Sequence, residues 1–408
     1  MKPKISFSEE QKDWIKRPLL SNIEKILDYR GRTPKKLGLS WSDTGFLALS
    51  ALNVKNGYID FNADANYGDQ ELYDRWMGDN HLHKRQVVFT TEAPMGNVAQ
   101  IPNDDLYILS QRTIAFEVKH DLIREDFLAT LLRSPKIFNE LTSLSSGGTA
   151  KGVSQKSLSN LKVCVPASLE EQSVIGSLFR TLDDLLTSYK DNLTNYQSLK
   201  ATMLSKMFPK AGQTFPDIRL DGFEGEWEKL KLREVVHTNP KSELPENFKY
   251  IDLESVVGTR INKIREERKE SAPSRAQRLA KKGDVFYQTV RPYQKNNYLF
   301  ILDEIDYVFS TGYAQLRPIS KRCDSDFLLI LLQNNRFLSK VLDRCTGTSY
   351  PAINVNDLIE ILIAIPSYDE QRAIGSYFSN LDNLIAAHQE KISQLETLKK
   401  KLLQDMFI

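Results

Sequence analysis

Residues of the types that bind metals or act as nucleophiles are few in this chain, and they do not cluster. Only two of the five histidines are close together in the sequence, and the set is His81, His83, His120, His237 and His388. The cysteines have no CxxC spacing and stand far apart, at Cys164, Cys323 and Cys345. No group of carboxylates completes a metal-binding set. We therefore expect surface histidines and reduced thiols, and we predict that the chain binds no metal.

The motifs of common nucleotide- and cofactor-dependent enzymes are also missing. The turn SSGGTAKG, which begins at Ser145, lacks the G-x-x-x-x-G-K-[ST] spacing of a P-loop, and no GxSxG motif occurs. A DNA methyltransferase would need a glycine-rich cofactor loop and an Asn-Pro-Pro-aromatic sequence, and TNPKSE at Thr238 is not one. We expect no bound cofactor. A nuclease site of paired carboxylates and a lysine has a sparser signature and stays an open alternative.

Two kinds of segment have the composition to contact phosphate groups. Between Thr259 and Lys282 nine Lys or Arg residues stand against three Glu, a local charge of +6 in a chain whose net charge is only +2. Phosphate contact and a solvated surface both fit this segment. The Gly- and Ser-rich turns Ser145–Gly152 and Cys345–Ala352 occupy matched positions. Each could hold a phosphate through backbone N–H groups or act as a structural hinge.

The composition indicates a soluble globular protein with at least two domains. Hydrophobic residues make up 41% of the 408 residues and charged residues 26%, and no apolar run approaches eighteen residues. The first residues, MKPKISFSEEQKDWIKR, lack the apolar core of a secretion signal. We therefore expect a cytoplasmic protein with no membrane contact.

An internal repeat is the most informative feature of the sequence. A segment that begins at Ser145 is matched by one that begins at Cys345, an offset of 200 that becomes 199 after Pro366. Between 174–208 and 373–407, twelve of thirty-five positions are identical. Fainter matches link ALSALNVKNGYI with YIDLESVVGTRI, and VVFTTEAP with DVFYQTVRP. Each copy therefore has a variable front part and a well-matched back part.

The back parts predict two long helices of about 38 residues each. Their apolar and aromatic side chains recur in a heptad stripe with few β-branched residues. In the first copy the stripe consists of Ile175, Phe179, Leu182, Leu186, Tyr189, Leu193, Tyr196 and Met203. In the second copy it consists of Ile374, Phe378, Leu381, Ile385, Ile392, Leu395 and Leu402.

A long helix with a single apolar stripe must bury that stripe against something. The favoured partner is the helix of the other copy, and near-symmetry between two copies in one chain would make the coiled coil antiparallel. The alternative is that each helix packs separately on its own front domain. Ser168 and Ser367 could cap the two helices, and Pro209 should end the first.

The front parts predict mixed α/β structure. Runs rich in β-branched and aromatic residues indicate strands, namely FLALSAL, QVVFTT, LYILSQRTIAFEV, GDVFYQTV and DYVFSTGYAQLRPI. Short helices are expected at DFLATLLRSPKIFNEL and DFLLILLQNNRFLSKVL. The predicted fold class is α/β (α+β), with two such domains related by an internal pseudo-two-fold repeat.

This duplicated arrangement resembles the specificity subunits of Type I restriction–modification systems. The resemblance is carried by GVSQKSLSNLKVCVPASLEEQSVIGSLFRTLDDLL, by INVNDLIEILIAIPSYDEQRAIGSYFSNLDNLI and by the junction FPDIRLDGFEGEWEKLKL. It covers essentially the whole chain. It implies a first target recognition domain, a central helical region, a linker, a second recognition domain and a C-terminal helical region, at residues 1–150, 151–210, 211–226, 227–350 and 351–408.

The resemblance implies a protein without a catalytic centre that reads DNA on behalf of partners. Each recognition domain would read one half of an asymmetric, bipartite site in double-stranded DNA. The helices would set the spacer and dock two modification (methyltransferase) subunits, and two restriction (motor-nuclease) subunits would join them. The partners would use S-adenosylmethionine and ATP with Mg²⁺, so that adenine methylation and restriction are directed to the site. The compartment would be the cytoplasm of a bacterium or archaeon.

Within the recognition domains we predict DNA contacts in loops at matched positions. Arg can pair with guanine, Gln can pair with adenine, and Glu can accept a hydrogen bond from cytosine. In the first domain the predicted contacts are Lys55, Asn56, Thr90, Thr91, Glu92, Gln111 and Arg112. In the second domain they are Arg260, Asn262, Lys263, Gln288, Thr289, Arg291 and Tyr293.

Two other classes of protein are open alternatives. One is an enzyme with a cryptic methyltransferase or nuclease site, against which the missing cofactor motifs argue. The other is a structural coiled-coil adaptor with no role in nucleic-acid binding. The differences between the two front domains argue against an adaptor, because a scaffold gains nothing from two unlike heads.

Overall fold

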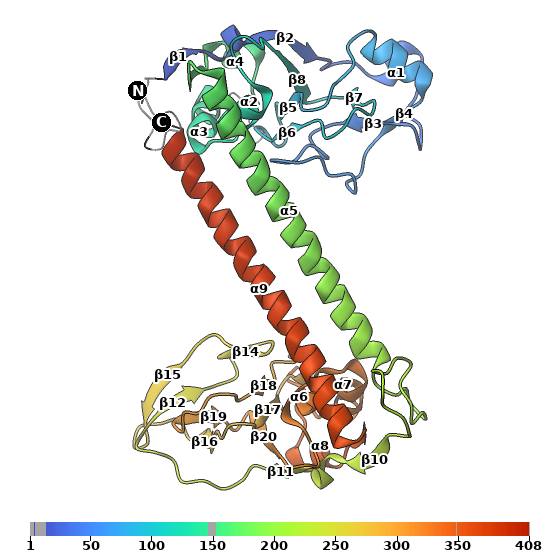
Figure 1. Ribbon diagram of the computed structural model, residues 1–408, viewed down its shortest axis with the longest axis vertical. Coiled ribbons are helices and arrows are strands. Elements are labelled where there is room, and N and C mark those ends of the chain that lie inside the picture. Colours follow the sequence, from blue (N-terminus) through green and yellow to red (C-terminus); the bar gives the residue numbers. More distant parts are fainter. Residues whose placement is uncertain (1–3, 5–13, 146–151, 348, 408) are drawn as a thin grey trace. The chain divides into compact units, whose positions relative to one another are not determined.

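The computed structural model describes residues 4, 14–145, 152–347 and 349–407. They form two compact units, unit 1 (Met1–Lys190 and Glu390–Ile408) and unit 2 (Asp191–Gln389). Each unit contains one head of mixed α/β structure and one half of each long helix (Figure 1). The units therefore divide the chain differently from the ranges suggested by the sequence, because both long helices run from one unit into the other.

The head of unit 1 contains two sheets. The larger is antiparallel, in the order β2-β8-β5-β6, with β2 at Ile23–Asp28, β8 at Thr113–Val118, β5 at Val87–Thr90 and β6 at Val98–Gln100. The smaller has the order β4-β3-β7, with β4 at Tyr67–Gly68, β3 at Phe46–Leu49 and β7 at Ile108–Leu109. Helix α1 (Gln70–Met77) buries Trp76 and Met77 in the same core as the smaller sheet.

Three short helices and a two-stranded ribbon complete this head. The helices are α2 (Glu125–Leu132), α3 (Pro135–Leu144) and α4 (Gln155–Asn160). The ribbon pairs β1 (Ile15–Pro18) with β9 (Lys162–Val165) in antiparallel fashion. One core cluster joins Phe127 of α2 to Phe89 and Phe116 of the larger sheet.

The head of unit 2 repeats this plan. Its antiparallel sheet has the order β11-β20-β17-β18, at Val236–Thr238, Tyr313–Pro318, Val285–Gln288 and Tyr298–Leu299. Its second sheet has the order β15-β12-β19-β16, at Arg265–Arg268, Asn247–Ile251, Tyr307–Ser310 and Ala276–Leu279. The remaining elements are α6 (Ser325–Gln333), α7 (Asn335–Leu342), α8 (Val355–Ile359), the hairpin β13–β14 (Val256–Val257 and Arg260–Ile261) and the ribbon β10–β21 (Glu228–Lys231 and Leu362–Ile365).

The predicted mixed α/β fold and its strand runs are confirmed, and the differences between the heads are local. Within the described residues, α1 has no counterpart in unit 2. The basic segment 259–282 contains β14, β15 and β16, so this charge-rich stretch forms strands and loops. The two heads thus share a frame and differ in what is attached to it.

The predicted long helices are α5 (Leu169–Lys206) and α9 (Tyr368–Met406), and they pair in antiparallel fashion (Figure 1). In unit 1, Lys399 forms an ion pair with Asp183, and Lys190 Nζ lies 2.7 Å from Glu396 Oε1. In unit 2, Lys200 Nζ lies 2.5 Å from Asp382 Oδ1. The residue numbers of the partners on α9 decrease as those on α5 increase, so the antiparallel coiled coil is confirmed.

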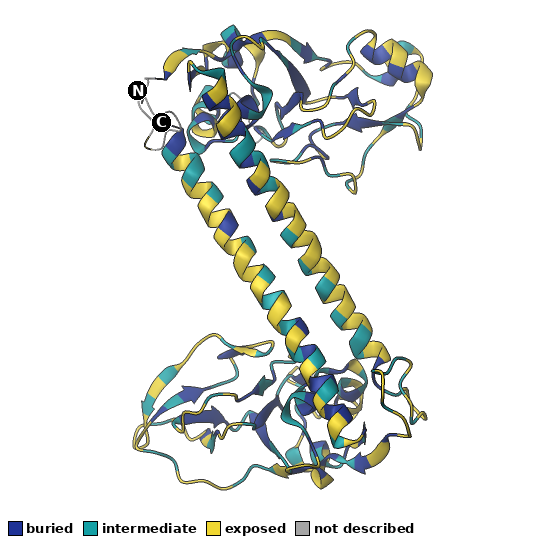
Figure 2. Cartoon of the chain, viewed as in Figure 1, coloured by how far each residue is buried: buried dark blue, intermediate teal, exposed yellow. Residues whose placement is uncertain are grey.

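Each heptad stripe is buried in both of the predicted ways. Its first part packs on the head that precedes the helix, and its later part packs against the other long helix. Ile175 and Phe179 belong to the core of the head of unit 1, and Leu186 lies in the same cluster as Leu395 of α9. Every predicted stripe residue is buried or half-buried, whereas the outward faces of both helices are exposed (Figure 2). Ser168 Oγ and Ser367 Oγ accept bonds from the N–H groups of the third residue on, as predicted for helix caps.

The joint between helix and head explains why the repeat contains Gln and Gly. Gln172 Nε2 donates to Pro166 O at 2.9 Å, and Gln371 Nε2 donates to Pro366 O at 3.0 Å. A Cβ on Gly176 would lie 2.5 Å from Asp126 Cβ. Each glycine therefore lets a long helix approach the backbone of a head helix closely.

The far end of each helix lies in the core of the other unit. In unit 1, the Phe407 ring is 5.9 Å from Trp14 and 5.8 Å from Phe127. In unit 2, the Phe208 ring is 5.8 Å from Trp227 and 5.9 Å from Phe327. These aromatic clusters occupy equivalent positions in the repeat, so each head is completed by the helix that begins in the other.

Candidate nucleic-acid interface

In the first head, the turn that carries Lys55 and Asn56 is tied to the loop between β5 and β6. Lys55 N donates to Tyr58 O at 3.0 Å, which closes the turn. Asn97 Nδ2 donates to Val54 O at 3.0 Å from the neighbouring loop. Lys55 is half-buried and Asn56 exposed. This pair of residues is thus presented on a braced turn.

Two predicted contacts, at the end of β5 and the start of the β5–β6 loop, are buried. Thr90 Oγ1 donates to Pro94 O at 2.7 Å, and Thr91 Oγ1 donates to Arg112 O at 3.2 Å. Neither side chain reaches solvent. We therefore assign Thr90 and Thr91 a structural role in shaping the loop, in place of the predicted contact with DNA.

Glu92, Gln111 and Arg112 lie together at the surface of this head. Arg112 Nε is 3.1 Å from Glu92 Oε1, and both side chains are about half exposed. Arg112 has φ +63°, a left-handed conformation that is unfavourable for a residue with a Cβ. Gln111 Nε2 donates to Arg32 O at 3.1 Å. The predicted residues of these two loops therefore form one polar patch.

A basic loop next to this patch was missed by the sequence analysis. Arg30 and Arg32 are exposed, and Arg32 stacks over the Tyr29 ring at 4.5 Å. Burial alone would raise the pKa of Asp28, but hydrogen bonds from Arg30 and Gln155 outweigh it and hold that pKa below its ordinary value. The signal in the sequence is the set of four basic residues in the run RGRTPKK, at Arg30, Arg32, Lys35 and Lys36.

In the second head, the equivalent turn is the β13–β14 hairpin. Arg260, Asn262 and Lys263 are exposed on it and beside it. Gly258 N donates to Asn296 Oδ1 at 2.9 Å, which ties the hairpin to the β17–β18 loop. The same two loops are therefore joined in both heads, through different hydrogen bonds.

Two more predicted contacts, at the end of β17 and the start of the β17–β18 loop, are buried. Gln288 Nε2 donates to Val290 O at 2.7 Å and to Gln294 Oε1 at 2.8 Å. Thr289 Oγ1 donates to Gly312 O at 2.8 Å, as Thr91 does to Arg112 O. Gln288 and Thr289 thus also have a structural role. The other ten predicted contacts are half-buried or exposed and stay predictions.

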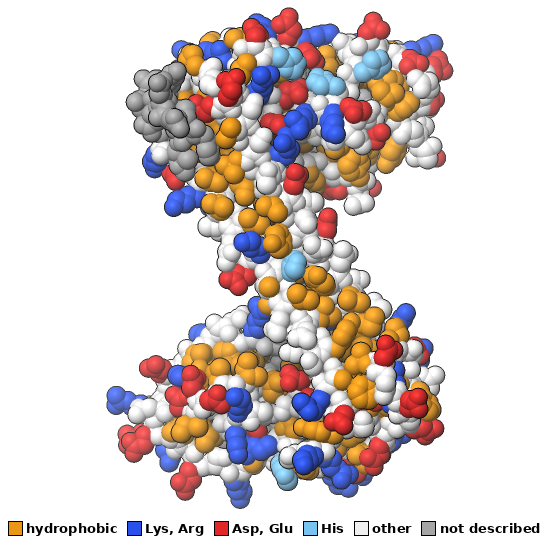
Figure 3. Space-filling view, in the orientation of Figure 1, with side chains coloured by type: hydrophobic (Ala, Val, Ile, Leu, Met, Phe, Trp, Pro, Cys, Tyr) orange, Lys and Arg blue, Asp and Glu red, His pale blue; other side chains and the backbone are white. Residues whose placement is uncertain are grey.

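In the basic segment 259–282, Arg278 is a half-buried cation that forms no ion pair with a described residue. Burial lowers the pKa of Arg278, and its Nε has no hydrogen-bond partner within the described residues. Arg265 differs, because its Nη2 lies 3.0 Å from Asp252 Oδ2. A half-buried guanidinium without an anion favours phosphate contact over a merely solvated surface. Acidic and basic side chains are otherwise interspersed over both heads in Figure 3.

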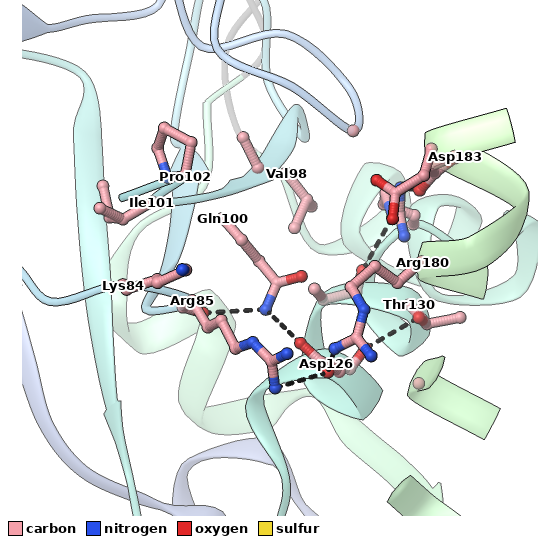
Figure 4. Close-up of a pocket in the computed structure, with 16 residues that line it drawn as sticks. Lys84, Arg85, Val98, Gln100, Ile101, Pro102, Asp126, Thr130, Arg180 and Asp183 are labelled. Atoms are coloured by element: carbon pink, nitrogen blue, oxygen red, sulfur yellow. Dashed lines mark hydrogen bonds and ion pairs between the residues drawn. The ribbon is translucent and has the colours of Figure 1, made fainter. Parts of the chain in front are cut away.

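A cleft of about 280 Å³ in unit 1 brings carboxylates and a lysine together (Figure 4). Asp126 Oδ2 is 2.6 Å from Arg180 Nη1, and Gln100 Nε2 donates to Asp126 Oδ1 at 2.9 Å. Asp183 is likewise bound by Arg133 at 2.6 Å. Carboxylates held by arginine serve as counterions, so this cleft gives no support to the nuclease alternative.

Neither a metal-binding group nor a membrane-spanning helix is found in the described part of the chain. They contain no group of three or more His, Cys, Asp or Glu side chains that could hold a metal ion. Among the helices described, none is long and apolar enough to cross a membrane. Of the thiols, Cys164 and Cys323 are buried and Cys345 half-buried, all unpaired, and burial raises the pKa of Cys323 to about 12.

Both Gly- and Ser-rich turns are only partly described. Residues 146–151 of the first turn and residue 348 of the second lie outside the described residues. In the second turn, Thr346 and Ala352 form a β-bridge, and Ala352 also bridges to Val290. This turn is therefore joined to the β17–β18 loop.

The duplicated frame with two unlike loop faces matches a known family. The model of the Type I restriction modification DNA specificity domain matches residues 20–196 and 224–397, one match for each copy. The chain belongs to this family.

Two named relatives are similar to this chain in sequence, and a solved structure is similar to it in fold. The Type I restriction enzyme MjaVIII specificity subunit of Methanocaldococcus jannaschii is 26% identical over 313 residues, 72% of each chain. The putative MjaX specificity subunit of the same organism is 23% identical over 431 residues, covering 98% of this chain and 94% of the relative. The S subunit from M. genitalium has a TM-score of 0.65 at 17% identity, covering 100% of this chain and 99% of that one.

Proposed function

We propose that this chain is a non-catalytic reader in which each head recognises one half of an asymmetric, bipartite DNA site. The family assignment supplies DNA specificity, and the division between heads is our own step. The division of recognition between the heads rests on one observation. The helix–head joints are the same in both units, whereas the exposed loops differ. In the aligned repeat, Arg112 of the first head corresponds to Gly312 of the second, and Ala93 corresponds to Arg291. A frame shared by both heads, with different reading loops on it, is what two different half-sites would require.

An exchange of one head tests this proposal. Residues 20–145 are replaced by the corresponding segment of a relative with a different site, and methylated adenines are mapped in cells that also express the modification subunit. We expect one half of the site to change and the other half to stay the same. Changed bases in both halves would contradict separate readers.

The long helices expose leucines at equivalent positions in the two units, which supports the docking of two modification subunits. In unit 1, Leu185 and Leu398 are 41% and 46% exposed, close in sequence to the Asp183–Lys399 ion pair. In unit 2, Leu384 and Leu199 are 44% and 39% exposed and stand at the equivalent positions. Repeated exposed leucines on a polar coiled coil indicate a protein interface, and two copies of it fit two copies of one partner.

Charge substitutions at the exposed leucines of unit 1 test this stoichiometry. Leu185→Asp combined with Leu398→Asp should remove one modification subunit from the complex, as measured by native mass spectrometry. Asn192→Asp, on an exposed position of the same helix, is the control for added charge. A double variant that still binds two subunits would refute this docking site.

The proposal assigns S-adenosylmethionine and ATP to the partner subunits, and the absence of cofactor motifs in this sequence supports it. Calorimetry on the purified chain should detect no binding of either molecule. Micromolar binding of S-adenosylmethionine to the chain alone would instead favour a cryptic methyltransferase.

A further inference from the structure

The β17–β18 loop of the second head is held rigidly by amide side chains beneath it. Gln288 and Asn297 are both about 1% exposed. Gln288 N donates to Asn297 Oδ1 at 2.9 Å, and Asn296 N donates to Gln288 Oε1 at 3.3 Å. Both polar atoms of the Gln288 side chain are bonded, whereas Asn297 Nδ2 has no hydrogen-bond partner within the described residues. The buried hydrogen bonds of Gln288 and of Asn297 Oδ1 favour one conformation of the loop. The residues at the top of this loop are therefore presented in a defined geometry.

Arg291 stands at the top of the loop in a special conformation. Its φ is +54°, in the left-handed region, and its N–H donates to Pro351 O at 2.7 Å. Its guanidinium lies 4.2 Å from the centre of the Tyr350 ring. No hydrogen bond or ion pair of this guanidinium is found within the described residues. Strained backbone that is retained in a rigid loop is typical of functional sites.

We propose that Arg291 reads a guanine in the half-site of the second head, with Tyr350 as its positioning residue. This inference rests on the proposed function. A guanidinium that stacks on an aromatic ring keeps its planar set of donors free, and this set matches O6 and N7 of guanine. A contact to a phosphate needs no such fixed plane, whereas base readout does. Tyr350 is 63% exposed, so the stacked pair is accessible to DNA.

The first head has no equivalent of this pair. The position of Arg291 is occupied there by Ala93, and the position of Tyr350 by Ala150, as the repeat offsets show. The guanine requirement that we infer from Arg291 therefore belongs to the second half-site alone.

Competition binding with the purified complex of the full chain and its modification subunit tests this inference. Duplexes carry the site with each base pair of the second half replaced in turn. Loss of one guanine should weaken wild-type binding about 5- to 160-fold, the equivalent of about 1–3 kcal/mol for a bidentate contact. In Arg291→Gly that ratio should fall to about one, while the penalties at other positions stay. Glycine also relieves the left-handed strain, so thermal stability should not fall.

Three further variants separate readout from structure. Tyr350→Phe should keep the guanine preference, and Tyr350→Leu should reduce it. Lys295→Gly is the matched control, because Lys295 also has φ +54° but its Nζ donates to Gln333 O within the head. Lys295→Gly should keep the full pattern of preferences.

Two results would overturn the inference alone. One is an Arg291→Gly complex with unchanged preferences, and the other is a complex that binds all duplexes more weakly by the same factor, as loss of a phosphate contact would cause. Wild-type complex without any sequence preference would overturn the proposed function and the inference together.

Discussion

The exchange of helix ends between units predicts where a substitution at the end of the chain acts. Phe407 is 5% exposed in the core of unit 1, although the helix that carries it begins in unit 2. Phe407→Ala should therefore destabilise unit 1. Removal of a buried Phe side chain costs about 3–5 kcal/mol.

The aromatic neighbours place the expected cost in the upper part of that range. Phe407 lies within 6.4 Å of the rings of Trp14, Phe127 and Phe179. Each such pair contributes about 0.5–1.5 kcal/mol beyond the buried area. For a unit of about 200 residues, where 1 kcal/mol corresponds to about 2–4 °C, the melting temperature of unit 1 should fall by about 8–20 °C.

Hydrogen exchange measured by mass spectrometry resolves the two units. In Phe407→Ala, strands β5 and β8 of unit 1 should lose protection, while β17 and β20 of unit 2 should lose much less. Phe208→Ala is the matched variant and should reverse the pattern. Loss of protection mainly in unit 2 on removal of Phe407 would refute the reasoning.

Three further predictions follow from other contacts. Gly176→Ala places a Cβ 2.5 Å from Asp126 Cβ. It should lower the free energy of unfolding, measured by urea titration, by about 1–3 kcal/mol. An unchanged free energy of unfolding would contradict the close approach of helix and head. Burial raises the pKa of Glu125, which means that its charged carboxylate destabilises the folded state once the pH exceeds that pKa. The melting temperature of Glu125→Gln should therefore increase relative to that of the wild type as the pH rises from about 4.5 to 7. A relative loss would show that its ion pair with a neighbouring histidine dominates. Four residues inserted into each helix, after Lys190 and Gln389, add about 6 Å. If the helices set the spacer, mapped methylation should show it longer by about one or two base pairs, and an unchanged spacer with full activity would contradict that role.

The sequence predicted the fold well where one physical requirement dominated. The heptad stripe required burial along its whole length, so the helices and their antiparallel pairing could be predicted from periodicity. The repeat offset then related Asp183 to Asp382 and Lys200 to Lys399, the residues that form the two equivalent ion pairs. The exchange of helix ends was not predicted, because Phe208 and Phe407 lie beyond the regular stripe and their partners Phe327 and Trp14 are distant in sequence.

The candidate interface was harder to predict because loop residues of the same type have opposite roles. Thr91 and Thr289 have the polar character of DNA contacts, yet both donate to a backbone carbonyl of the adjacent turn. Only the burial of a side chain distinguishes such a brace from a contact. Tyr350 was missed for a different reason, since its contact with Arg291 joins segments almost sixty residues apart.

These braces explain how two heads can share one frame and still differ in what they present. In each head a buried threonine donates to the carbonyl at the turn between the two sheets, at Arg112 in the first and Gly312 in the second. The side chain at that turn contributes nothing to the bond, because the acceptor is backbone. It can therefore change from arginine to glycine without leaving a buried polar group unpaired. Stability depends on the carbonyl and the threonine, while the exposed side chain is free to determine specificity.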